Sequence, residues 1–365
     1  MIRTFLTLPQ RAATSYPIFL DAKIIEVLES LVTHEEQLVI ITDHRVKKIY
    51  GTSLHRELLE RGFHVLLFSF EAGEQSKTSK TKEELELAML QAACGRKSVI
   101  IALGGGVVGD IAGFVAATYL RGIDYIQVPT TLLAMIDSSI GGKTGVNTIY
   151  GKNLLGAFWQ PRALLIDLDF LKTLSQQQLI NGLVEAIKIF LTSDREAFLM
   201  VCNQIDLLLE ADSTTLRWVI QRALKHKVAI VQRDERESNE RMVLNFGHTI
   251  GHALEHLSNY KIMHGYAVGL GILVELKISQ LLGFLPQEEF NIVTDLFARL
   301  KITPAIIAKI DPKDLLRATL HDKKNLAGST RYVLLDQLGV VRKKGEAFLH
   351  FLDDTIVLRA LKEIR

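Results

Sequence analysis

Cysteine is scarce in this chain of 365 residues, in which only Cys94 and Cys202 are present. Two isolated cysteines are too few for a disulfide framework or a thiolate metal cluster, and they are typical of a protein in a reducing compartment. The first residues also lack an apolar stretch of signal-peptide length before Pro9 and Arg11. We therefore expect a mature, cytoplasmic protein.

The chain also has almost no net charge. Its 43 lysines and arginines are nearly balanced by 41 aspartates and glutamates, which gives a formal net charge of +2. The basic residues are dispersed rather than gathered into a stripe, so nucleic acid is not expected as a partner. Apolar residues, in contrast, make up 48% of the chain. A chain of this length exceeds the usual single hydrophobic core, so two domains are expected.

One apolar stretch, residues 98–120, is long enough to cross a bilayer and carries a single charge, on Asp110. Gly104, Gly105, Gly106 and Gly109 interrupt it in the middle, beside this carboxylate, which would be costly in lipid. The pattern therefore predicts a buried strand, a glycine turn and a buried helix, and no contact with a membrane.

Short β-branched runs alternate with helical patterns through the first half of the chain. Strands are predicted at 38–42, 65–68, 99–103, 125–128 and 163–166, and covering helices at 46–61 and 80–95. This alternation is typical of an open, Rossmann-like α/β sheet with parallel strands, whose ligands bind at the carboxyl ends of the strands.

Long helical patterns replace the strands after about Ser175. They are predicted at 177–192, 195–210, 215–233, 247–256, 266–282 and 287–300, with one strand-like run at 331–335. We place a domain boundary near Leu174, which divides an α/β domain, 1–174, from a mainly α-helical domain, 175–365. Because no Pro-rich linker separates the two halves, we expect them to pack closely with the site between them.

The glycine turn after the strand at 99–103 matches a nucleotide-binding motif. Gly104, Gly106 and Gly109 satisfy G-x-G-x-x-G between a strand and a helix, where backbone N–H groups and the helix dipole bind a pyrophosphate. The acidic residue expected about 20 positions later is poorly matched, because Asp124 opens the next strand instead of ending it. A tight buried turn without a ligand therefore remains an alternative.

Hydroxyl groups, lysines and glycines cluster after the strand at 125–128. The cluster includes Thr130, Thr131, the run Gly141-Gly142-Lys143-Thr144-Gly145 and the run Gly151-Lys152-Asn153. A loop of this composition can cradle phosphates and other polar oxygens. The run at 142–144 resembles the end of a Walker A loop, but Asp137 occupies the place of that motif's first glycine, so we exclude an ATPase of this class.

Histidines repeat every four residues, at His248, His252 and His256, on one predicted helix. Side chains at this spacing share a face, so His248 and His252 form a candidate metal pair, and a structural row of histidines is an equal alternative. His264, at the start of the next predicted helix, is a third candidate ligand.

Glu185 lies in an apolar helical segment, where a carboxylate needs a partner. The ordinary partner is Lys188, three residues on. The other is a metal, because one glutamate and two histidines are a common ligand set that leaves a position open for a substrate oxygen.

Seven segments resemble, in their order and approximate spacing, those of 3-dehydroquinate synthases, a family within the sugar phosphate cyclase superfamily. They are GGGVVGDIAGFVAATYLRG, QVPTTLLAMIDSSIGGKTGVN, GKNLLGAFWQP, GLVEAIK, LNFGHTIGHALE, HGYAVG and HDKKN. The resemblance runs from about Leu38 to Gly339. It implies a two-domain enzyme, often a homodimer, in which the first domain binds NAD and the second holds a divalent ion, zinc or cobalt.

The resemblance also implies a reaction, the conversion of 3-deoxy-D-arabino-heptulosonate 7-phosphate into 3-dehydroquinate and phosphate. This is a lyase step of the shikimate pathway, which leads to chorismate and the aromatic amino acids. The family oxidises C5 with NAD, which acidifies the C6 proton, and then eliminates phosphate. The hydride returns to C5, the ring opens and an aldol addition closes a carbocycle, so that NAD is regenerated in each turnover.

The positions that match the family's functional residues fall into three sets. The implied metal ligands are Glu185, His248 and His264, and His252 then contacts substrate or its phosphate instead of the metal. The implied substrate and catalytic residues are Asp137, Lys143, Lys152, Asn153, Lys188, Lys227, Arg241, Asn245, His252, Lys323 and Lys324. The implied NAD-binding residues are Asp43, Gly73, Glu74, Lys77, Gly105, Gly106, Val107, Gly109, Asp110, Thr130, Thr131, Lys143, Lys152, Phe170 and Thr173.

Three other functions are alternatives. A related cyclase that makes a valiolone or an inosose would replace residues around the substrate carboxylate and phosphate, whereas Lys227, Asn245 and His252 keep the dehydroquinate pattern. A metal-dependent polyol dehydrogenase of related fold would not need so many lysines. A non-catalytic nucleotide-binding protein would not need the acidic, imidazole and cationic positions together.

Overall fold

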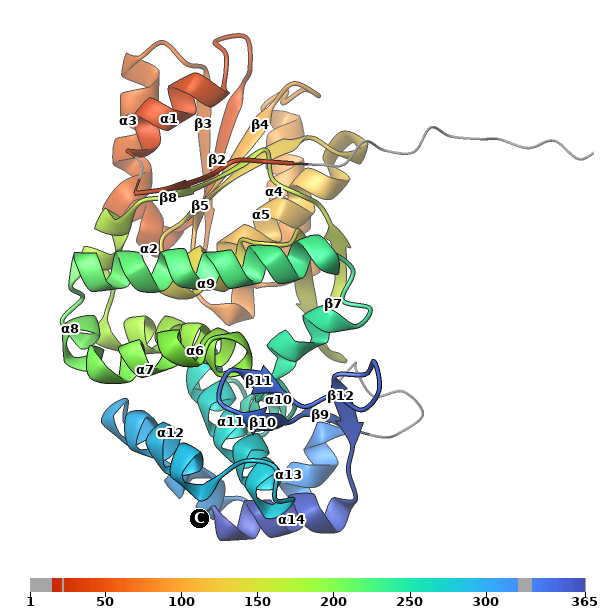
Figure 1. The fold of residues 1–365 in the computed structure, drawn as a ribbon. Helices are drawn as coiled ribbons and strands as arrows, with labels where there is room; N and C mark the ends of the chain where they lie inside the picture. The colour runs from red at the N-terminus through yellow and green to blue at the C-terminus, as the bar shows by residue number, and fades with distance from the viewer. Residues whose placement is uncertain (1–14, 22, 321–329, 365) are drawn as a thin grey trace, which may run out of the picture.

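A six-stranded parallel sheet lies at one end of the molecule and a set of packed helices at the other (Figure 1). The computed structural model describes residues 15–21, 23–320 and 330–364. The strand order is β1-β8-β5-β4-β2-β3. The bounds are β1 (Ile18–Leu20), β2 (Leu38–Asp43), β3 (Val65–Phe70), β4 (Val99–Gly104), β5 (Asp124–Pro129) and β8 (Ala163–Ile166). The predicted fold class and the five predicted strands are confirmed, while the three-residue edge strand β1 was not predicted.

Both faces of the sheet are covered, and alternate residues of each strand face opposite sides. Leu38 and Ile40 of β2 belong to a core shared with α1 (Ile24–Leu31) and α3 (Thr52–Glu60). Val39 and Ile41 belong to a second core with α4 (Ser79–Gln91) and α5 (Gly106–Thr118). Burial on both faces explains why these strands are uninterrupted apolar runs.

The apolar stretch at 98–120 forms β4, the glycine turn and α5, as predicted. Both elements pack inside the second core, which accounts for their apolar composition. Within the described part of the chain, no helix combines the length and the apolar character that a membrane crossing requires.

The polar cluster at 141–153 differs from the predicted loop, because most of it forms a β-hairpin. Strand β6 (Lys143–Thr148) pairs antiparallel with β7 (Gly151–Phe158). Gly145 lies opposite Gly156, and a Cβ on Gly156 would lie 2.0 Å from the carbonyl oxygen of Thr144. The glycines therefore permit close strand pairing here, whereas their number in the sequence indicated a flexible loop.

The second half is mainly helical, as predicted. Its helices are α6 (Gln176–Ser193), α7 (Arg195–Asn203), α8 (Ile205–Leu209), α9 (Ser213–Arg233), α10 (His248–Leu257), α11 (His264–Leu281), α12 (Gln287–Arg299), α13 (Pro312–Thr319) and α14 (Asp354–Glu363). The helix predicted at 195–210 is divided at Gln204. Side chains of Ser175, Asp194 and Asp212 cap α6, α7 and α9 by accepting N–H groups of their first turns.

Short elements complete the structure. The strands are β9 (Arg331–Val333), β10 (Leu335–Gln337), β11 (Val340–Val341) and β12 (Leu349–Phe351), and β9 pairs with β12 and β10 with β11. The turns of helix are α2 (His44–Val46), η1 (Lys47–Gly51), η2 (Glu74–Ser76), η3 (Tyr119–Arg121), η4 (Ala134–Ser138), η5 (Leu168–Thr173), η6 (Glu240–Asn245) and η7 (Pro304–Lys309). Of these, η4 and η6 lie between the two halves near the cavity described below.

A single apolar core joins the two halves. Leu103 and Val128 of the sheet share it with Leu183 of α6 and Ile220 of α9. Helix α9 crosses the molecule between the sheet and the other helices of the second half (Figure 1). The relative position of the halves is therefore determined by apolar packing.

Helices α10 and α11 approach each other so closely that a glycine is required at the contact. A Cβ on Gly271 would lie 1.9 Å from the carbonyl oxygen of Gly247. We expect Gly271→Ala to destabilise the fold by about 1–3 kcal/mol or more, because neither backbone can move without disturbing the core. Urea unfolding measures the change. Gly95→Ala is the control, since a Cβ there meets nothing within 4 Å, and equal unfolding midpoints for the two variants would contradict the prediction.

Candidate functional site

A cavity of about 990 Å³ lies where the carboxyl ends of the sheet strands face the helical half. Asp43 ends β2, Gly105 and Thr130 directly follow β4 and β5, and all three line one side of it. Asn181 and His248 line the other side, from α6 and from the start of α10. This edge is where open α/β sheets bind ligands, so the cavity is the candidate site.

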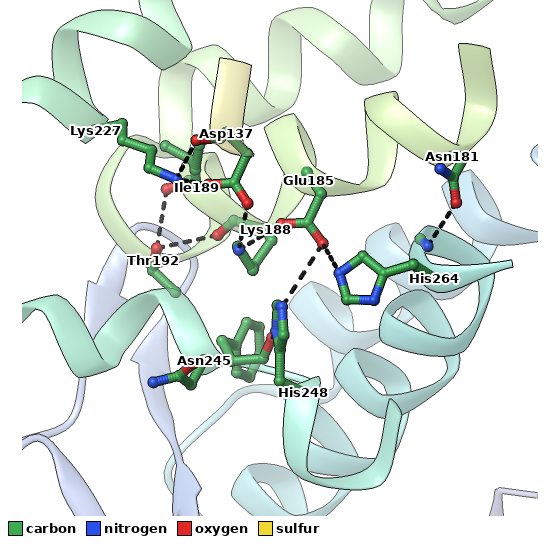
Figure 2. A network of polar contacts seen from close by, with 12 residues as sticks. Asp137, Asn181, Glu185, Lys188, Ile189, Thr192, Lys227, Asn245, His248 and His264 are labelled. Carbon is green, nitrogen blue, oxygen red and sulfur yellow. Dashed lines mark hydrogen bonds and ion pairs between the residues drawn. The ribbon is translucent and has the colours of Figure 1, made fainter. Parts of the chain in front are cut away.

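Glu185, His248 and His264 converge from three different helices (Figure 2). The Nε2 atoms of His248 and His264 lie 3.9 and 3.6 Å from Oε1 of Glu185. Lys188 donates to the other oxygen, Oε2, at 2.5 Å, so the ordinary ion pair predicted from the sequence is present. Glu185 is fully buried, and its Oε1 has no hydrogen-bond partner among the described residues. The ion pair and a cation site are therefore compatible.

Two glycines bring these histidines to Glu185. Gly247, directly before His248, has φ +76°, and a Cβ there would lie 2.7 Å from the backbone of Val268 and of Ile272 in α11. A Cβ on Gly265 would lie 2.2 Å from the carbonyl oxygen of Asn181 in α6. The three helices therefore meet at the first residues of α10 and α11, which are the two histidines.

The structure also brings His252 into this group. Its ring centroid lies 5.3 Å from that of His248 and 6.1 Å from that of His264. His252, Glu255 and His264 form a second trio with atoms close enough to hold an ion. Ring distance alone therefore does not separate the pair favoured by spacing from the trio favoured by resemblance.

Glu255 was missed in the sequence, although it lies in the same motif. It is 2% exposed, and its carboxylate contacts Nδ1 of His264 at 3.3 Å and Nζ of Lys152 at 2.8 Å. Burial would raise the pKa of Glu255, but these two partners hold it well below its usual value. Burial alone would lower the pKa of His264, but the neighbouring carboxylate of Glu255 outweighs this effect, so the pKa of His264 is raised. The available sequence signal was an acidic residue three positions after His252, on the same helix face.

Two buried lysines connect Glu185 to the sheet half of the molecule. Lys227 of α9 donates to the carboxylate of Asp137 in η4, and also to its carbonyl oxygen at 2.7 Å. Nζ of Lys188 lies 4.0 Å from Asp137 and 2.5 Å from Glu185. Carboxylates and ammonium groups therefore alternate along one chain of contacts, part of which is visible in Figure 2.

Glu237 is a second acidic residue that the sequence analysis missed. It pairs with Lys143 of β6 and accepts from Nδ2 of Asn245 at 2.8 Å. It lies in the turn between α9 and η6, where its φ is +59°. In the sequence it is one of several charged residues at 233–241, a pattern that is typical of an exposed turn.

The opposite end of the cavity contains the glycine turn and several charged side chains. Lys77 is 5% exposed, and it donates to Asp110 and to Oδ1 of Asn153, each at 2.5 Å. Glu74 accepts from Asn147 at 2.7 Å and lies 3.7 Å from Lys152. These contacts tie the turn after β3 to α5 and to the hairpin.

Most of the residues predicted for the site line this one cavity. All of the predicted substrate and NAD residues among the described positions do so except Gly109 and Phe170, and Glu185 lies directly behind the wall. A Cβ on Gly109 would meet Gln127 of β5 at 2.9 Å, so this glycine permits packing of helix against strand. Phe170 packs against Tyr50, with ring centroids 4.7 Å apart. Lys323 and Lys324 fall outside the described residues.

Comparisons with known proteins match nearly the whole chain. Residues 67–181 match a family model for the N-terminal part of 3-dehydroquinate synthase, and residues 182–325 match the model for its C-terminal part. The 3-dehydroquinate synthase of Geotalea uraniireducens is 40% identical over 329 residues, which cover 89% of this chain and 91% of the relative. That of Desulforamulus reducens is 38% identical over 331 residues, with coverage of 90% and 92%. The chain belongs to the 3-dehydroquinate synthase family.

Solved structures of other enzymes share the fold over nearly the whole chain. A 2-epi-5-epi-valiolone synthase from Streptomyces hygroscopicus subsp. jinggangensis, with NAD+ and Zn2+ bound, superposes with a TM-score of 0.89 at 26% identity, covering 98% and 99% of the chains. A 2-deoxy-scyllo-inosose synthase with carbaglucose-6-phosphate, NAD+ and Co2+ gives 0.87 at 26% identity, covering 95% and 96%. Glycerol dehydrogenase from Schizosaccharomyces pombe, 16% identical with a TM-score of 0.65 and coverage of 97% and 90%, shares the fold alone.

The turn that carries Glu237 and Arg241 depends on the carboxylate of Asp234. This group accepts N–H groups of Ser238 and Asn239 at 2.8 Å and of Arg241 at 3.0 Å. Burial opposes ionisation, but these donors lower the pKa of Asp234 to about 2. A lowered pKa in the folded state stabilises the protein above the pKa of the unfolded chain, near 4, and this stabilisation is lost as the pH falls towards 2.

We therefore expect Asp234→Asn to lower the free energy of unfolding by about 2 kcal/mol at pH 7. The difference from the parent protein should shrink as the pH falls from 4 towards 2, because the parent carboxylate is then protonated as well. Urea unfolding at pH 7, 4 and 3 measures it. An identical difference at all three values would contradict the prediction.

Proposed function

We propose that this chain is a 3-dehydroquinate synthase that converts 3-deoxy-D-arabino-heptulosonate 7-phosphate into 3-dehydroquinate and phosphate. Because the chain belongs to the 3-dehydroquinate synthase family, one observation is enough to support the proposal. A single cavity is lined by His248 and His264, with Glu185 directly behind them, and by several cationic side chains and a glycine turn. The three features suit, in that order, a metal ion, an anionic substrate and a dinucleotide.

The proposed metal ligands fit a divalent cation. Oε1 of Glu185 is buried without a hydrogen-bond partner in the described part of the chain, and it faces Nε2 of both histidines. Nδ1 of His248 lies 3.2 Å from the carbonyl oxygen of Phe246, and Nε2 is the nitrogen that faces Glu185. A bound zinc or cobalt ion would polarise a substrate hydroxyl or carbonyl oxygen.

The glycine turn fits the pyrophosphate of NAD. A Cβ on Gly105 would lie 3.1 Å from the side chain of Thr131, and one on Gly106 would lie 3.0 Å from Oγ of Ser138. These glycines therefore permit close packing of the loop after β5 against the first turn of α5. Both line the cavity, and the N–H groups of a helix's first turn lack partners within the helix and can bind a phosphate. Bound NAD would accept a hydride from substrate and return it. Glu74 and Lys77 are suited to bind ribose hydroxyls.

The remaining residues bind and orient the substrate. Lys143, Lys152 and Arg241 would neutralise its phosphate and carboxylate by charge-assisted hydrogen bonds, together with His252. Asp137 holds Lys227 in position, and Lys188 is held between Asp137 and Glu185. The leaving phosphate can itself accept the C6 proton, so this site needs no separate dyad for that step. Asn153, Asn245 and Glu237 complete the polar wall.

The alternative functions have weaker support. The valiolone and inosose synthases match at 26% identity, whereas 3-dehydroquinate synthases match at about 40% over nine-tenths of the chain. The polyol dehydrogenase likeness concerns the fold alone. The family resemblance further supports a cytoplasmic homodimer, with residues 1–174 as the NAD-binding domain and 175–365 as the domain for metal and substrate.

The proposed reaction is tested by following phosphate and NADH together. With the heptulosonate phosphate, NAD and zinc, we expect stoichiometric phosphate release and a product with the mass of 3-dehydroquinate. The absorbance of reduced nicotinamide should stay nearly flat, because the hydride returns within each turnover. One NADH per phosphate would contradict the proposal, and so would phosphate release without a carbocyclic product.

The proposed ligand set is tested by metal content. We expect His264→Ala to bind zinc or cobalt far more weakly, because it removes one of three protein ligands. His252→Ala should retain nearly normal metal content and lose activity. Chelation of the parent protein should abolish activity, and added metal should restore it. The reverse pattern in the two variants would support the pair of His248 and His252 instead.

A further inference from the structure

Glu255 is a buried carboxylate to which the proposed reaction assigns no role. It lies on α10, seven residues after His248 and three after His252, so that all three side chains share one helix face. Its oxygens contact different groups, with Oε2 3.3 Å from Nδ1 of His264 and Oε1 2.8 Å from Nζ of Lys152. A carboxylate that is 2% exposed and bound to two site residues can hold both in position.

The ring of His264 lies between two carboxylates. Nε2 is 3.6 Å from Oε1 of Glu185, and Nδ1 faces Glu255. A neutral imidazole that binds a cation through Nε2 carries its proton on Nδ1, which then donates to Glu255. A carboxylate in this position fixes the tautomer and the orientation of the ring, and it makes the ligand nitrogen more basic.

Lys152 reaches the same carboxylate from the other half of the molecule. It lies on β7 of the hairpin, and its Nζ lies 4.7 Å from the ring centroid of Tyr260, just after α10. Glu74, which lines the predicted dinucleotide end of the cavity, is 3.7 Å from the same ammonium group. Glu255 therefore contacts His264, beside the proposed metal site, and Lys152, which lies towards Glu74 and the predicted dinucleotide site.

We propose that Glu255 is a positioning residue, which orients His264 for the metal and places Lys152 between the metal and the dinucleotide. The inference rests on the metal ligands proposed above and adds a residue to that site. The competing arrangement makes Glu255 itself a ligand, with His252 and His264. In that arrangement His264 would bind through Nδ1, the nitrogen nearest Glu255, although its Nε2 faces Glu185.

The test measures the Kd for Co2+ of the full-length protein by competition with a chromophoric chelator. We expect E255Q to weaken binding by about 10- to 100-fold, because glutamine cannot accept from both His264 and Lys152. E255D should lie between E255Q and the parent protein, since its carboxylate retains both acceptors at shorter reach. K152M should change the Kd by less than about threefold, because the contact between Glu255 and His264 remains.

The control is Asp194→Asn, which alters a carboxylate of similar burial that binds Arg222 and His226 away from the cavity. It should lower thermal stability without changing the Kd for Co2+. A merely structural role for Glu255 predicts the same result for E255Q. A Kd within threefold of the parent value for E255Q, or an equal loss in K152M, would therefore overturn the proposal.

A double-mutant cycle separates this proposal from the ligand assignment. If Glu255 acts through His264, E255Q should have no further effect on Co2+ binding in a His264→Ala background. An equal fold-change in both backgrounds would overturn the positioning role. Loss of metal in His252→Ala and E255Q, but not in His248→Ala, would make Glu255 a ligand and overturn both proposals. Normal metal binding by His264→Ala would reject the ligand set itself. If His264→Ala binds Co2+ too weakly for its Kd to be measured, the Kd values of E255Q and E255D decide. A Kd of E255D between those of the parent protein and E255Q supports the proposal, and any other order contradicts it.

Discussion

The complete burial of the Glu185 carboxylate is the constraint on which the arrangement of the two halves depends. An isolated ionised carboxylate in such a place would cost several kcal/mol. One of its oxygens is compensated by Lys188, which is itself buried and reaches Asp137 in the sheet half. Asp137 in turn binds Lys227 of α9. Glu185 and Lys188 pair within α6, whereas Asp137 meets Lys188 and Lys227 only when sheet and helices are docked, so these contacts favour the same docked state as the shared apolar core.

Glycine makes this arrangement sterically possible at the points where side chains would separate the helices. Gly247, Gly265 and Gly271 each lie closer to a neighbouring backbone than a Cβ would allow. The first residues of α10 and α11 therefore meet beside α6, and both of these residues are histidines. In the sequence these glycines look like ordinary helix breakers. Their requirement becomes visible only when the partner helix is in place.

The sequence predicted the sheet well because burial on both faces requires uninterrupted β-branched runs, as in the residues of β2 and β4. It failed where pairing depends on glycine rather than on side chains. The hairpin of β6 and β7 has Gly145 opposite Gly156, a pattern that by composition indicates a loop. The edge strand β1 was too short to produce a periodic signal.

The candidate site was predictable as a set of chemical groups but not as a network. Glu237 lies in a charged run typical of an exposed turn, and Glu255 lies beside the histidine row. In neither case do adjacent residues reveal which side chains will contact the carboxylate. Both become recognisable through partners that are distant in the sequence, Lys143 for Glu237 and Lys152 for Glu255. The hairpin supplies both lysines, and it is also the element that the sequence did not predict.

Helical spacing favours His252 as the partner of His248, whereas the family resemblance favours His264. Spacing places His252 on the face of His248, and the structure agrees, with the rings 5.3 Å apart. The ring of His264 is equally distant from that of His248, at 5.3 Å. The proposed ligand set rests on the orientation of His264, which has Glu185 on the side of Nε2 and Glu255 on the side of Nδ1. A metal ligand needs a free nitrogen directed at the shared centre and a second nitrogen held by an acceptor. This orientation depends on carboxylates from two other positions in the chain, which a periodicity within one helix cannot specify.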